Sequence, residues 1–469
     1  MRVTPRWMIF SAWIGFGLVA CGGGGGGGGG GKGTSAIDAP TQKADSGILD
    51  SSFGTGGIAR HHNAAGGATG DGGQAIAVDA QGRILVAGSS DNAQGDEDMA
   101  VWRFDSTGAL DTTFGGGKGF FTHHNAGGGN GIDRAYAIAL DSQGRILVTG
   151  SSQSGFKADP LVVWRLTPEG LPDAAFGGGA GYVVVFGPSF SSGYGIVADS
   201  TDRILVVGVR AESAHGADMA LWRFHTNGTL DRNFAGGLGF FLHHSAAGGS
   251  SDDTGRALAI DSQGRIVVAG SSTSSAGTLA TVVWRIGPSG FLDSSFGAGQ
   301  GFVVHDGASG DDEGNSVAID SQGRIVVAGY RRNAYGNDDM AVWRWTESGT
   351  LDSTFGAGNG FIVHDNAAGG LGEDRANGVA IDASGRIVVA GWSMSAYAYH
   401  DLALWRLDSA GSLDPEFGAG KGFVTQDRAA GGSIDLPYAV ALDTEGRILV
   451  AGAALNLSLN FDVIVWRFH

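Results

Sequence analysis

The hydrophobic residues of this chain fall in short runs that polar and glycine-rich segments separate. Between residues 135 and 186 the runs are AYAIALD (135–141), RILVTGSS (145–152), LVVWRLT (161–167) and GYVVVF (181–186). Asp-Ser-Gln-Gly joins the first two runs and favours a tight turn, because Asp can accept hydrogen bonds from the backbone that follows it and Gly tolerates positive φ. Short apolar runs bounded by turn residues are typical of strands. The stretch therefore predicts a four-stranded antiparallel meander without helices.

The same pattern recurs along the chain from Leu49 onward. The arginine of the phrase DSQGRI and its variants stands at positions 83, 145, 203, 265, 324, 386 and 447. A Trp-Arg pair follows it in every unit, with Trp at 102, 164, 222, 284, 343, 405 and 466, and a phrase LDxxF links the third run to the fourth. Self-similarity at a fixed period indicates a repeat architecture. The chain holds seven copies of one unit.

The middle runs of each unit are apolar on both faces. After Arg83, Ile84 and Val86 point to one face of a strand, and Leu85 and Ala87 point to the other. A sheet with two apolar faces needs a neighbour on each side, and radial repetition supplies both. We therefore predict an all-β fold, a seven-bladed β-propeller of four-stranded antiparallel blades over residues 49–469. A β-helix is the alternative, and its shorter coils disfavour it.

The two ends of the repeat region are complementary. The segment GGIARHHN (56–63) matches the fourth strand of a unit, whereas the chain closes at the third strand of its last unit, residues 461–468. We predict that the N-terminal strand, residues 57–62, joins the last blade and closes the ring.

The recurrent phrases LDxxFG, ALDSQGRILVAGSS and DMAVWRF resemble the delta-60 repeat of bacterial secreted and surface proteins. The resemblance covers most of the chain. It implies a β-propeller and carries no general enzymatic activity.

The N-terminal segment predicts export. Arg2 and Arg6 precede the apolar run 7–20, which is short for a membrane span and suits a signal peptide over residues 1–21. The run ends in LVAC, which resembles the lipobox of bacterial lipoproteins and implies that Cys21 carries the lipid; an ordinary signal peptide with a chance Cys is the alternative. The absence of Asp at Gly22 implies the outer membrane of a Gram-negative cell. Residues 22–48, which begin with ten glycines, predict a flexible tether.

Composition narrows the function further. The formal net charge is −17, so the surface should repel nucleic acid and anionic headgroups. Cys21 is the only cysteine, which excludes an intrachain disulfide and a cysteine-based metal site. The sequence lacks GxSxG, HExxH, Walker and dinucleotide-binding motifs, and we expect no cofactor.

Recurrent aspartates form four sets. One stands at the first corner of each hairpin, as Asp79 does, and we interpret this set and the Asp of LDxxF as turn-capping groups. The other two sets precede the first and third strands and should lie on the opposite face. There they could form an acidic ring that attracts Ca²⁺ or cationic ligands. The alternative, which we favour, is that each Asp caps its own strand locally. The acidic-ring set comprises Asp71, Asp133, Asp253, Asp312, Asp374 and Asp435, and the second set comprises Asp98, Asp159, Asp218, Asp339, Asp401 and Asp462.

Histidine pairs such as His61-His62 do not predict a metal site, because adjacent strand residues point to opposite faces. Catalytic or binding residues should instead break the symmetry. The candidates lie in the loops between second and third strands, where exposed aromatics beside Arg can stack on sugars or pack against a protein; ordinary loop decoration is the alternative. They are Tyr330, Arg331, Arg332 and Tyr335 in one unit, and Trp392, Tyr397, Tyr399 and His400 in the next.

These features lead to one functional expectation and two alternatives. We expect a lipid-anchored, non-catalytic scaffold of the cell envelope that binds a glycan or an envelope protein. The first alternative is an extracellular polysaccharide hydrolase or lyase that uses carboxylates on the loop face, and the second is a purely architectural component. Catalysis needs one carboxylate that differs from its fellows, whereas each candidate Asp here recurs in nearly every unit.

Overall fold

The computed structural model describes residues 46–469 except residues 130, 156–158, 213–215 and 308–309. These residues belong to one compact unit, Lys43–His469. The predicted signal peptide, Cys21 and most of the predicted tether lie outside the described residues. The predicted tether extends to Ile48, but Gly47 N donates to His469 O and His469 N donates to Ile48 O. The boundary at residue 48 is therefore corrected, and the folded body includes Ser46.

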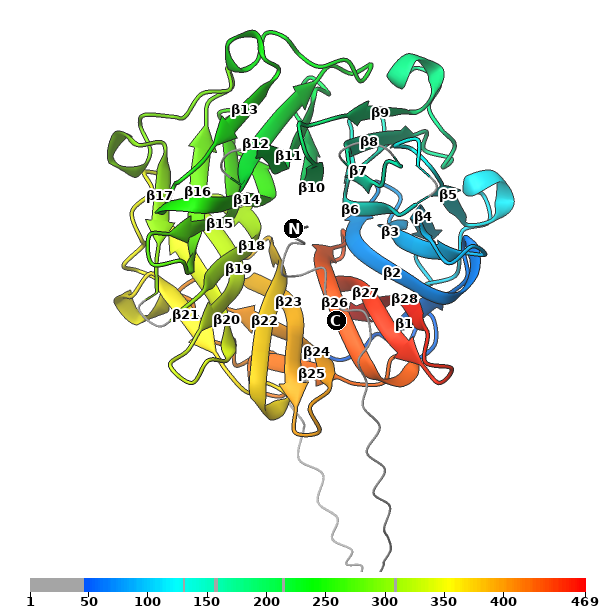
Figure 1. The fold of residues 1–469 in the computed structure, drawn as a ribbon. Coiled ribbons are helices and arrows are strands. Elements are labelled where there is room, and N and C mark those ends of the chain that lie inside the picture. Colours follow the sequence, from blue (N-terminus) through cyan, green and yellow to red (C-terminus); the bar gives the residue numbers. More distant parts are fainter. Residues whose placement is uncertain (1–45, 130, 156–158, 213–215, 308–309) are drawn as a thin grey trace, which may run out of the picture. The chain divides into compact units, whose positions relative to one another are not determined.

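The described residues form strands joined by turns and five 3₁₀ turns of three residues, as the sequence predicts for an all-β fold. Among these residues no helix has the length and apolarity of a membrane span. Figure 1 shows the strands grouped in arrays around a common centre, with the first strand of each array innermost.

Each array is an antiparallel meander, and we number the arrays along the chain. Array 1 holds β2 (Gly66–Val78), β3 (Ile84–Asn92), β4 (Glu97–Phe104) and β5 (Phe120–His123). Array 2 holds β6 (Asp133–Leu140), β7 (Ile146–Ser152), β8 (Leu161–Leu166) and β9 (Tyr182–Val185). Array 3 holds β10 (Ser191–Ala198), β11 (Ile204–Glu212), β12 (Gly216–Phe224) and β13 (Phe240–His243).

The next three arrays repeat this order. Array 4 holds β14 (Gly248–Ile260), β15 (Ile266–Ser274), β16 (Leu279–Ile286) and β17 (Phe302–His305). Array 5 holds β18 (Asp312–Ile319), β19 (Ile325–Arg332), β20 (Asp338–Trp345) and β21 (Phe361–His364). Array 6 holds β22 (Gly369–Ile381), β23 (Ile387–Ser395), β24 (His400–Leu407) and β25 (Phe423–Gln426).

The seventh array draws on both ends of the described chain. It holds β26 (Gly431–Leu442), β27 (Ile448–Asn456) and β28 (Phe461–Phe468), and β1 (Ile58–His61) pairs antiparallel with β28 from Ile58–Trp466 to His61–Val463. A single parallel bridge between Gly70 and Phe461 joins this array to array 1.

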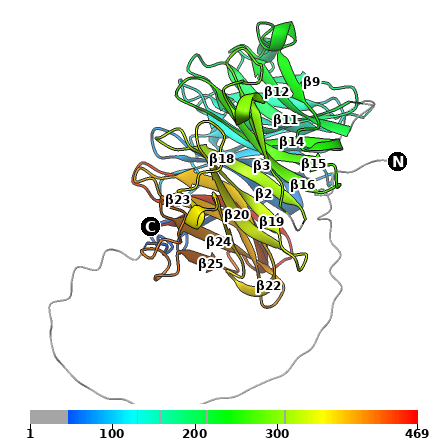
Figure 2. The same ribbon diagram turned by 90° about the vertical axis from the view of Figure 1, so that its left-hand side faces the viewer.

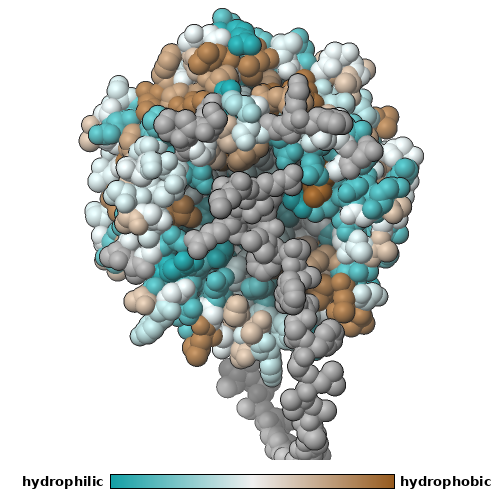
Figure 3. All heavy atoms as spheres, in the orientation of Figure 1, coloured by the Kyte–Doolittle hydropathy of each residue, from teal (hydrophilic) through white to brown (hydrophobic). Residues whose placement is uncertain are grey.

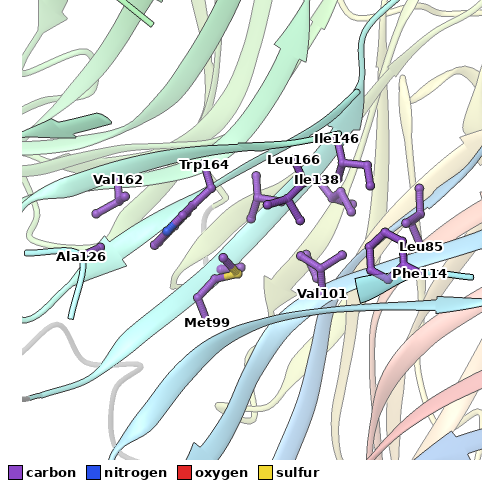
Figure 4. Close-up of a cluster of buried hydrophobic side chains, with 13 residues drawn as sticks. Leu85, Met99, Val101, Phe114, Ala126, Ile138, Ile146, Val162, Trp164 and Leu166 are labelled. Carbon is purple, nitrogen blue, oxygen red and sulfur yellow. The ribbon is translucent and has the colours of Figure 1, made fainter. Parts of the chain in front are cut away.

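The hydrophobic core lies between the arrays and not within one of them. Figure 4 shows one cluster, in which Met99 and Phe114 of array 1 face Ile138 and Trp164 of array 2. Six further clusters fill the other spaces between neighbours, including one that joins array 7 to array 1. Figure 2 shows the arrays from the side. The two apolar faces of each middle strand are thus buried against two neighbours, which is the arrangement that the sequence pattern predicts.

The meander gives each array two ends. The turns between first and second strands and the LDxxF connections lie at one end, which we call the turn face. The hairpins between second and third strands and the entries to the next array lie at the other end, which we call the tip face.

Candidate functional site

Aspartates that recur in every unit build the turn face. Asp79 accepts hydrogen bonds from the backbone N–H of Gln81 and Arg83, both at 2.9 Å, and from Arg83 Nε at 2.6 Å. The hairpin corners of all other arrays repeat the bond from Arg Nε to the Asp carboxylate. The predicted turn-capping role is confirmed for this set.

The Asp of LDxxF does more than cap a turn. Asp231 accepts hydrogen bonds from Asn233 N at 2.9 Å and from Arg223 Nε at 2.8 Å, and the Arg223 guanidinium lies 4.4 Å above the centre of the Phe234 ring. Arg223 also donates to the carbonyl of Pro288 in the next array. Equivalent Arg–Phe stacks occur in all seven arrays. These buried pairs tie neighbouring arrays together.

The same arrangement connects the two ends of the described chain. Arg467 in β28 donates to Asp50 at 2.8 Å and stacks on Phe53 at 4.4 Å. Burial raises the pKa of Asp50, but hydrogen bonds from Ser52 and the charge of Arg467 outweigh it and lower this pKa to about 2.

Four outer-strand histidines, His61, His123, His243 and His364, accept a hydrogen bond from the tryptophan of the next array. The indole Nε1 of Trp284 donates to His243 Nδ1 at 3.2 Å, and the bond recurs from Trp102, Trp164 and Trp405. Burial, with His244 beside it, lowers the pKa of His243 to about 4. The imidazole therefore stays neutral and can accept the bond. The regular interval of 41 residues between each His and its Trp could have revealed this pairing in the sequence.

The acidic-ring aspartates lie at the tip face and are buried. Asp133 accepts hydrogen bonds from Asn125 N at 2.7 Å and Ala126 N at 3.1 Å, so its carboxylate holds the loop that enters its own strand. The set Asp71, Asp133, Asp253, Asp312, Asp374 and Asp435 is at most 4% exposed. Within the described part of the chain no three His, Cys, Asp or Glu are grouped to hold a metal ion.

The residues that surround these aspartates at the tip face differ between arrays. Between arrays 1 and 2, His124 Nδ1 lies 2.9 Å from Asp98 Oδ1. At the position of His124 the sixth array has Asp427, next to Asp401 and Asp435. Burial raises the pKa of Asp401 to about 6 and that of Asp435 to about 7, and the charge of Asp427 adds to both shifts.

The symmetry-breaking candidates divide into two groups. Tyr335, Tyr397 and Tyr399 lie in exposed hairpin tips, as predicted. Tyr330 and Trp392 are buried, which corrects the expectation that they are exposed loop residues: they lie within β19 and β23, where Tyr330 donates to Glu313 Oε2 at 2.9 Å.

The other candidates also belong to strands and not to loops. Arg331 and Arg332 end β19, and His400 begins β24, with its ring 4.3 Å from that of Trp392. Arg332 Nε donates to Asp338 at 2.8 Å. These strands extend farther toward the tip face than the apolar pattern suggests, because polar side chains continue the pairing beyond the apolar run.

The innermost strands carry a second non-repeating set that the sequence analysis missed. The rings of Tyr136 and Tyr194, from arrays 2 and 3, lie 5.4 Å apart, and Arg256 of array 4 lies 5.6 Å above Tyr194 and donates to Glu313 of array 5 at 2.8 Å. Asn315 and Asn377 then donate to the backbone carbonyls of Ala376 and Pro437 in the following arrays, and Tyr438 of array 7 bonds Gln74 of array 1. Side-chain contacts therefore link the innermost strand of each array to that of the next, from array 2 to array 7 and from array 7 to array 1.

The tip face of arrays 5 to 7 exposes apolar side chains. The hairpin turns share one frame, in which an Asn or Ser side chain at the end of the second strand accepts a hydrogen bond from the backbone of the turn. Asn92, Asn333 and Asn456 accept from the N–H groups of Gln94, Tyr335 and Ser458. In arrays 4 and 6, Ser274 and Ser395 accept from the N–H groups of Ala276 and Tyr399. The residues on this frame differ, since arrays 1 and 4 carry Ala93–Gly95 and Ser275–Gly277. Arrays 5 to 7 expose Tyr335, Leu371, Tyr397, Tyr399, Leu457 and Leu459, by 46% to 92%. We call these six residues the tip patch.

Comparison with known families agrees with this architecture. A family described as "Domain of unknown function (DUF5122) beta-propeller" matches residues 81–114, 200–234, 262–296, 321–355 and 383–417. A "Beta-propeller repeat" family matches residues 126–157. The fold is a β-propeller, and the chain is a repeat protein.

Several solved structures are similar to the chain at low identity. A protein of unknown function from Dyadobacter fermentans DSM 18053 is 12% identical, with 88% of this chain and 97% of that chain covered and a TM-score of 0.41. An ulvan lyase of polysaccharide lyase family PL25 is 13% identical, with 82% and 92% covered and a TM-score of 0.43. A fucose lectin from Kordia zhangzhouensis is 14% identical, with 32% and 90% covered and a TM-score of 0.22. No curated protein matches the chain. These likenesses are too low to indicate an activity.

Proposed function

We propose that the protein is a lipid-anchored, non-catalytic β-propeller of the cell envelope, which binds a ligand or partner through the tip patch. The observation that carries the proposal is the concentration of exposed Tyr and Leu side chains on three neighbouring arrays. All but Leu371, which lies in β22, stand on hairpins whose frame also occurs elsewhere with small or polar residues. Large apolar side chains gathered on a surface are typical of interaction sites, and aromatic residues supply much of their binding energy.

The proposal includes a closed ring of seven blades of the delta-60 type, in which β1 completes the seventh. The pairing of β1 with β28 and the hydrophobic cluster between arrays 7 and 1 support it. The export segment and the resemblance of LVAC to a lipobox support attachment through Cys21, in the outer membrane of a Gram-negative cell. The ligand is a glycan or an envelope protein and not a nucleic acid, because the net charge is −17.

The chemistry of the non-repeating residues supports binding over catalysis. The carboxylates among them are engaged: Glu97 accepts from Arg134 at 2.6 Å, Glu313 accepts from Arg256 and Tyr330, and Asp338 accepts from Arg332. A carboxylate held by a guanidinium keeps its charge and is a poor proton donor at neutral pH.

Binding is tested with a glycan array and with pull-downs from detergent-solubilised envelope. Replacing Tyr397 and Tyr399 by Ala should weaken binding about tenfold or more, because each aromatic anchor contributes roughly 1–2 kcal/mol. Replacing Gln94 by Ala, on the equivalent hairpin of array 1, is the matched control and should change nothing. Equal binding by both variants would contradict the proposal.

One observation favours the alternative, a polysaccharide hydrolase or lyase. The carboxyl groups of Asp401 and Asp435 have pKa values of about 6 and 7, in the range that proton transfer requires. A polysaccharide-turnover assay separates the two functions: turnover that is lost on replacing Asp401 by Asn would establish the enzyme and refute the non-catalytic scaffold.

A further inference from the structure

A second group of exposed apolar residues lies at the opposite end of the arrays from the tip patch. Leu171, Leu238 and Phe291 stand in the LDxxF connections of arrays 2, 3 and 4, on the turn face, and are 48% to 55% exposed. We call them the turn-face cluster. A methyl group placed on Gly236 would lie 3.5 Å from the Phe291 ring, so this ring rests on the connection that carries Leu238. Figure 3 shows hydrophobic residues gathered along the upper edge of the molecule, in the region of β9, β12 and β13.

The same positions in other arrays are polar or small. Where array 4 has Phe291, arrays 1, 5 and 6 have Ala109, Thr350 and Ser412. Where array 3 has Leu238, arrays 1, 5 and 6 have Lys118, Asn359 and Lys421. The connection can therefore fold with a polar residue at either position, and the fold does not require the turn-face cluster.

The N-terminal chain joins the body on this face. Ser46 pairs with Phe417 of the array 6 connection, and Gly418 N donates to Ser46 O. In the same way, Gly177 N of the array 2 connection donates to Asn227 O, which lies in the LDxxF connection of array 3. Ser46–Ile48 therefore takes the place that the connection turn of the next array takes elsewhere. Ile48 is itself 54% exposed. The 45 residues that precede Ser46, with the apolar run 7–20, thus lead to the face that carries the turn-face cluster.

Local charge indicates the kind of surface that would cover the turn-face cluster. In its three connections Asp173 and Asp231 are paired with Arg165 and Arg223. Arg232 is exposed, and its Nη1 donates to the carbonyl of Leu238 at 3.1 Å. Glu169 is also exposed, and its negative charge balances the positive charge of Arg232. Exposed Leu and Phe beside an Arg suit the boundary between headgroups and acyl chains, whereas the net charge of −17 disfavours an anionic bilayer.

We propose that the turn face of arrays 2 to 4 lies against a zwitterionic lipid surface, with Leu171, Leu238 and Phe291 inserted at the headgroup level. The tip patch then points away from the membrane. This inference goes beyond the proposed function, because it concerns residues that the tip patch does not include.

The experiment uses the compact unit Lys43–His469, whose hydrophobic clusters all lie within it, and phosphatidylcholine vesicles. The unit should float with the vesicles. Replacing Leu171, Leu238 and Phe291 together by Asp should lower the bound fraction about tenfold or more, since each apolar side chain that leaves the lipid weakens the partition. The matched control replaces Tyr335, Tyr397 and Leu457 by Asp and should leave the partition unchanged. Failure of the unit to float, or equal losses in both variants, would overturn the proposal.

A second measurement identifies the residue that enters the lipid. The unit contains no cysteine, so an environment-sensitive fluorophore can be attached after the substitution Phe291→Cys or, as control, Tyr397→Cys. Vesicles should shift the emission to the blue only for the first. A concentration-dependent dimer that the triple turn-face variant abolishes would instead assign this surface to a second copy of the chain, and would contradict the proposal.

Discussion

The two ends of the arrays are built from the same repeats but are used differently. On the turn face, the Asp hairpin corners and the Arg–Asp–Phe groups recur in every array and are hydrogen-bonded and buried. On the tip face, the hairpins of arrays 1 and 4 to 7 keep a common frame built on an Asn or a Ser, while the residues at their ends change from small and polar to Tyr and Leu. The recurring buried groups of the turn face therefore contribute stability, whereas the hairpin ends of the tip face differ between arrays without loss of the fold.

The largest expected effect comes from breaking the turn face where the two ends of the chain meet. Deleting residues 49–63 removes β1, the buried Phe53 and the Asp50 partner of Arg467. We expect a loss of more than about 5 kcal/mol in the free energy of unfolding, because a large core side chain is lost and a buried guanidinium is left unpaired. Thermal and urea denaturation measure it. Deletion of residues 31–45 is the control of equal length, and an unchanged transition after deletion of 49–63 would refute the role of β1.

A smaller effect is expected from a single turn-face pair. Asp231→Ala leaves the guanidinium of Arg223 buried without its carboxylate, since both side chains are at most 5% exposed. Removing one partner of such a pair costs about 3 kcal/mol. Urea denaturation measures the loss. Asp105→Ala, on an exposed turn of the same face, should cost less than about 1 kcal/mol, and equal losses would contradict the assignment.

The Trp–His bonds between arrays should contribute less again. His243→Phe leaves the indole N–H of Trp284 without its acceptor, and we expect a loss of about 1–2 kcal/mol at pH 7.5. The opposite substitution can be made in array 6, where Gln426 occupies the position that His243 occupies in array 3. The indole N–H of Trp466 in the next array has no hydrogen-bond partner in the structure. Gln426→His should stabilise the protein by about 1 kcal/mol.

The pH dependence of this loss follows from the pKa of His243. It is about 4 in the folded protein and about 6.5 in the unfolded chain, so the unfolded chain binds more protons between these values. The stabilisation by His243 is therefore complete above pH ~6.5 and is lost as the pH falls toward 4. The difference between the wild type and His243→Phe should shrink over this window, and a constant difference would contradict the bond to a neutral imidazole.

The smallest effects concern the tip-face corners. The folded-state pKa of Asp401 is about 6, above its ordinary value of 3.8, so the charged carboxylate destabilises the folded protein above pH ~6. Asp401→Asn should stabilise the protein by about 1 kcal/mol at pH 8, after allowance for partial exposure, and the gain should vanish as the pH falls to 4. Asp98→Asn, where His124 stands in place of an Asp, should give no such gain. Denaturation at the two pH values tests both.

The sequence predicted the arrays well because their determinants are local and repeated. Each Asp-Ser-Gln-Gly corner fixes a hairpin by bonds within five residues, and the doubly apolar middle strands demand neighbours on both sides. The exposed Tyr335, Tyr397 and Tyr399 were also found, because a break in a regular repeat is visible in the sequence.

The sequence could not show which non-repeating residues are buried. Tyr330 and Trp392 resemble their exposed neighbours in type, and only the extension of β19 and β23 places them inside. The contacts of Tyr136 with Tyr194 and of Arg256 with Glu313 join different arrays, so they depend on how the innermost strands meet. Such contacts leave no local pattern.

The proposed closure of the ring rests on the pairing of β1 with β28, and both faces would depend on it, because an open end would expose the core of the last array. Amide hydrogen exchange followed by mass spectrometry tests this most directly by comparing β28 and β1 with the central strands of array 4. If the ring is closed, β28 and β1 should exchange as slowly as β15 and β16. Rapid exchange of β28 and β1 under conditions where array 4 stays protected would contradict it.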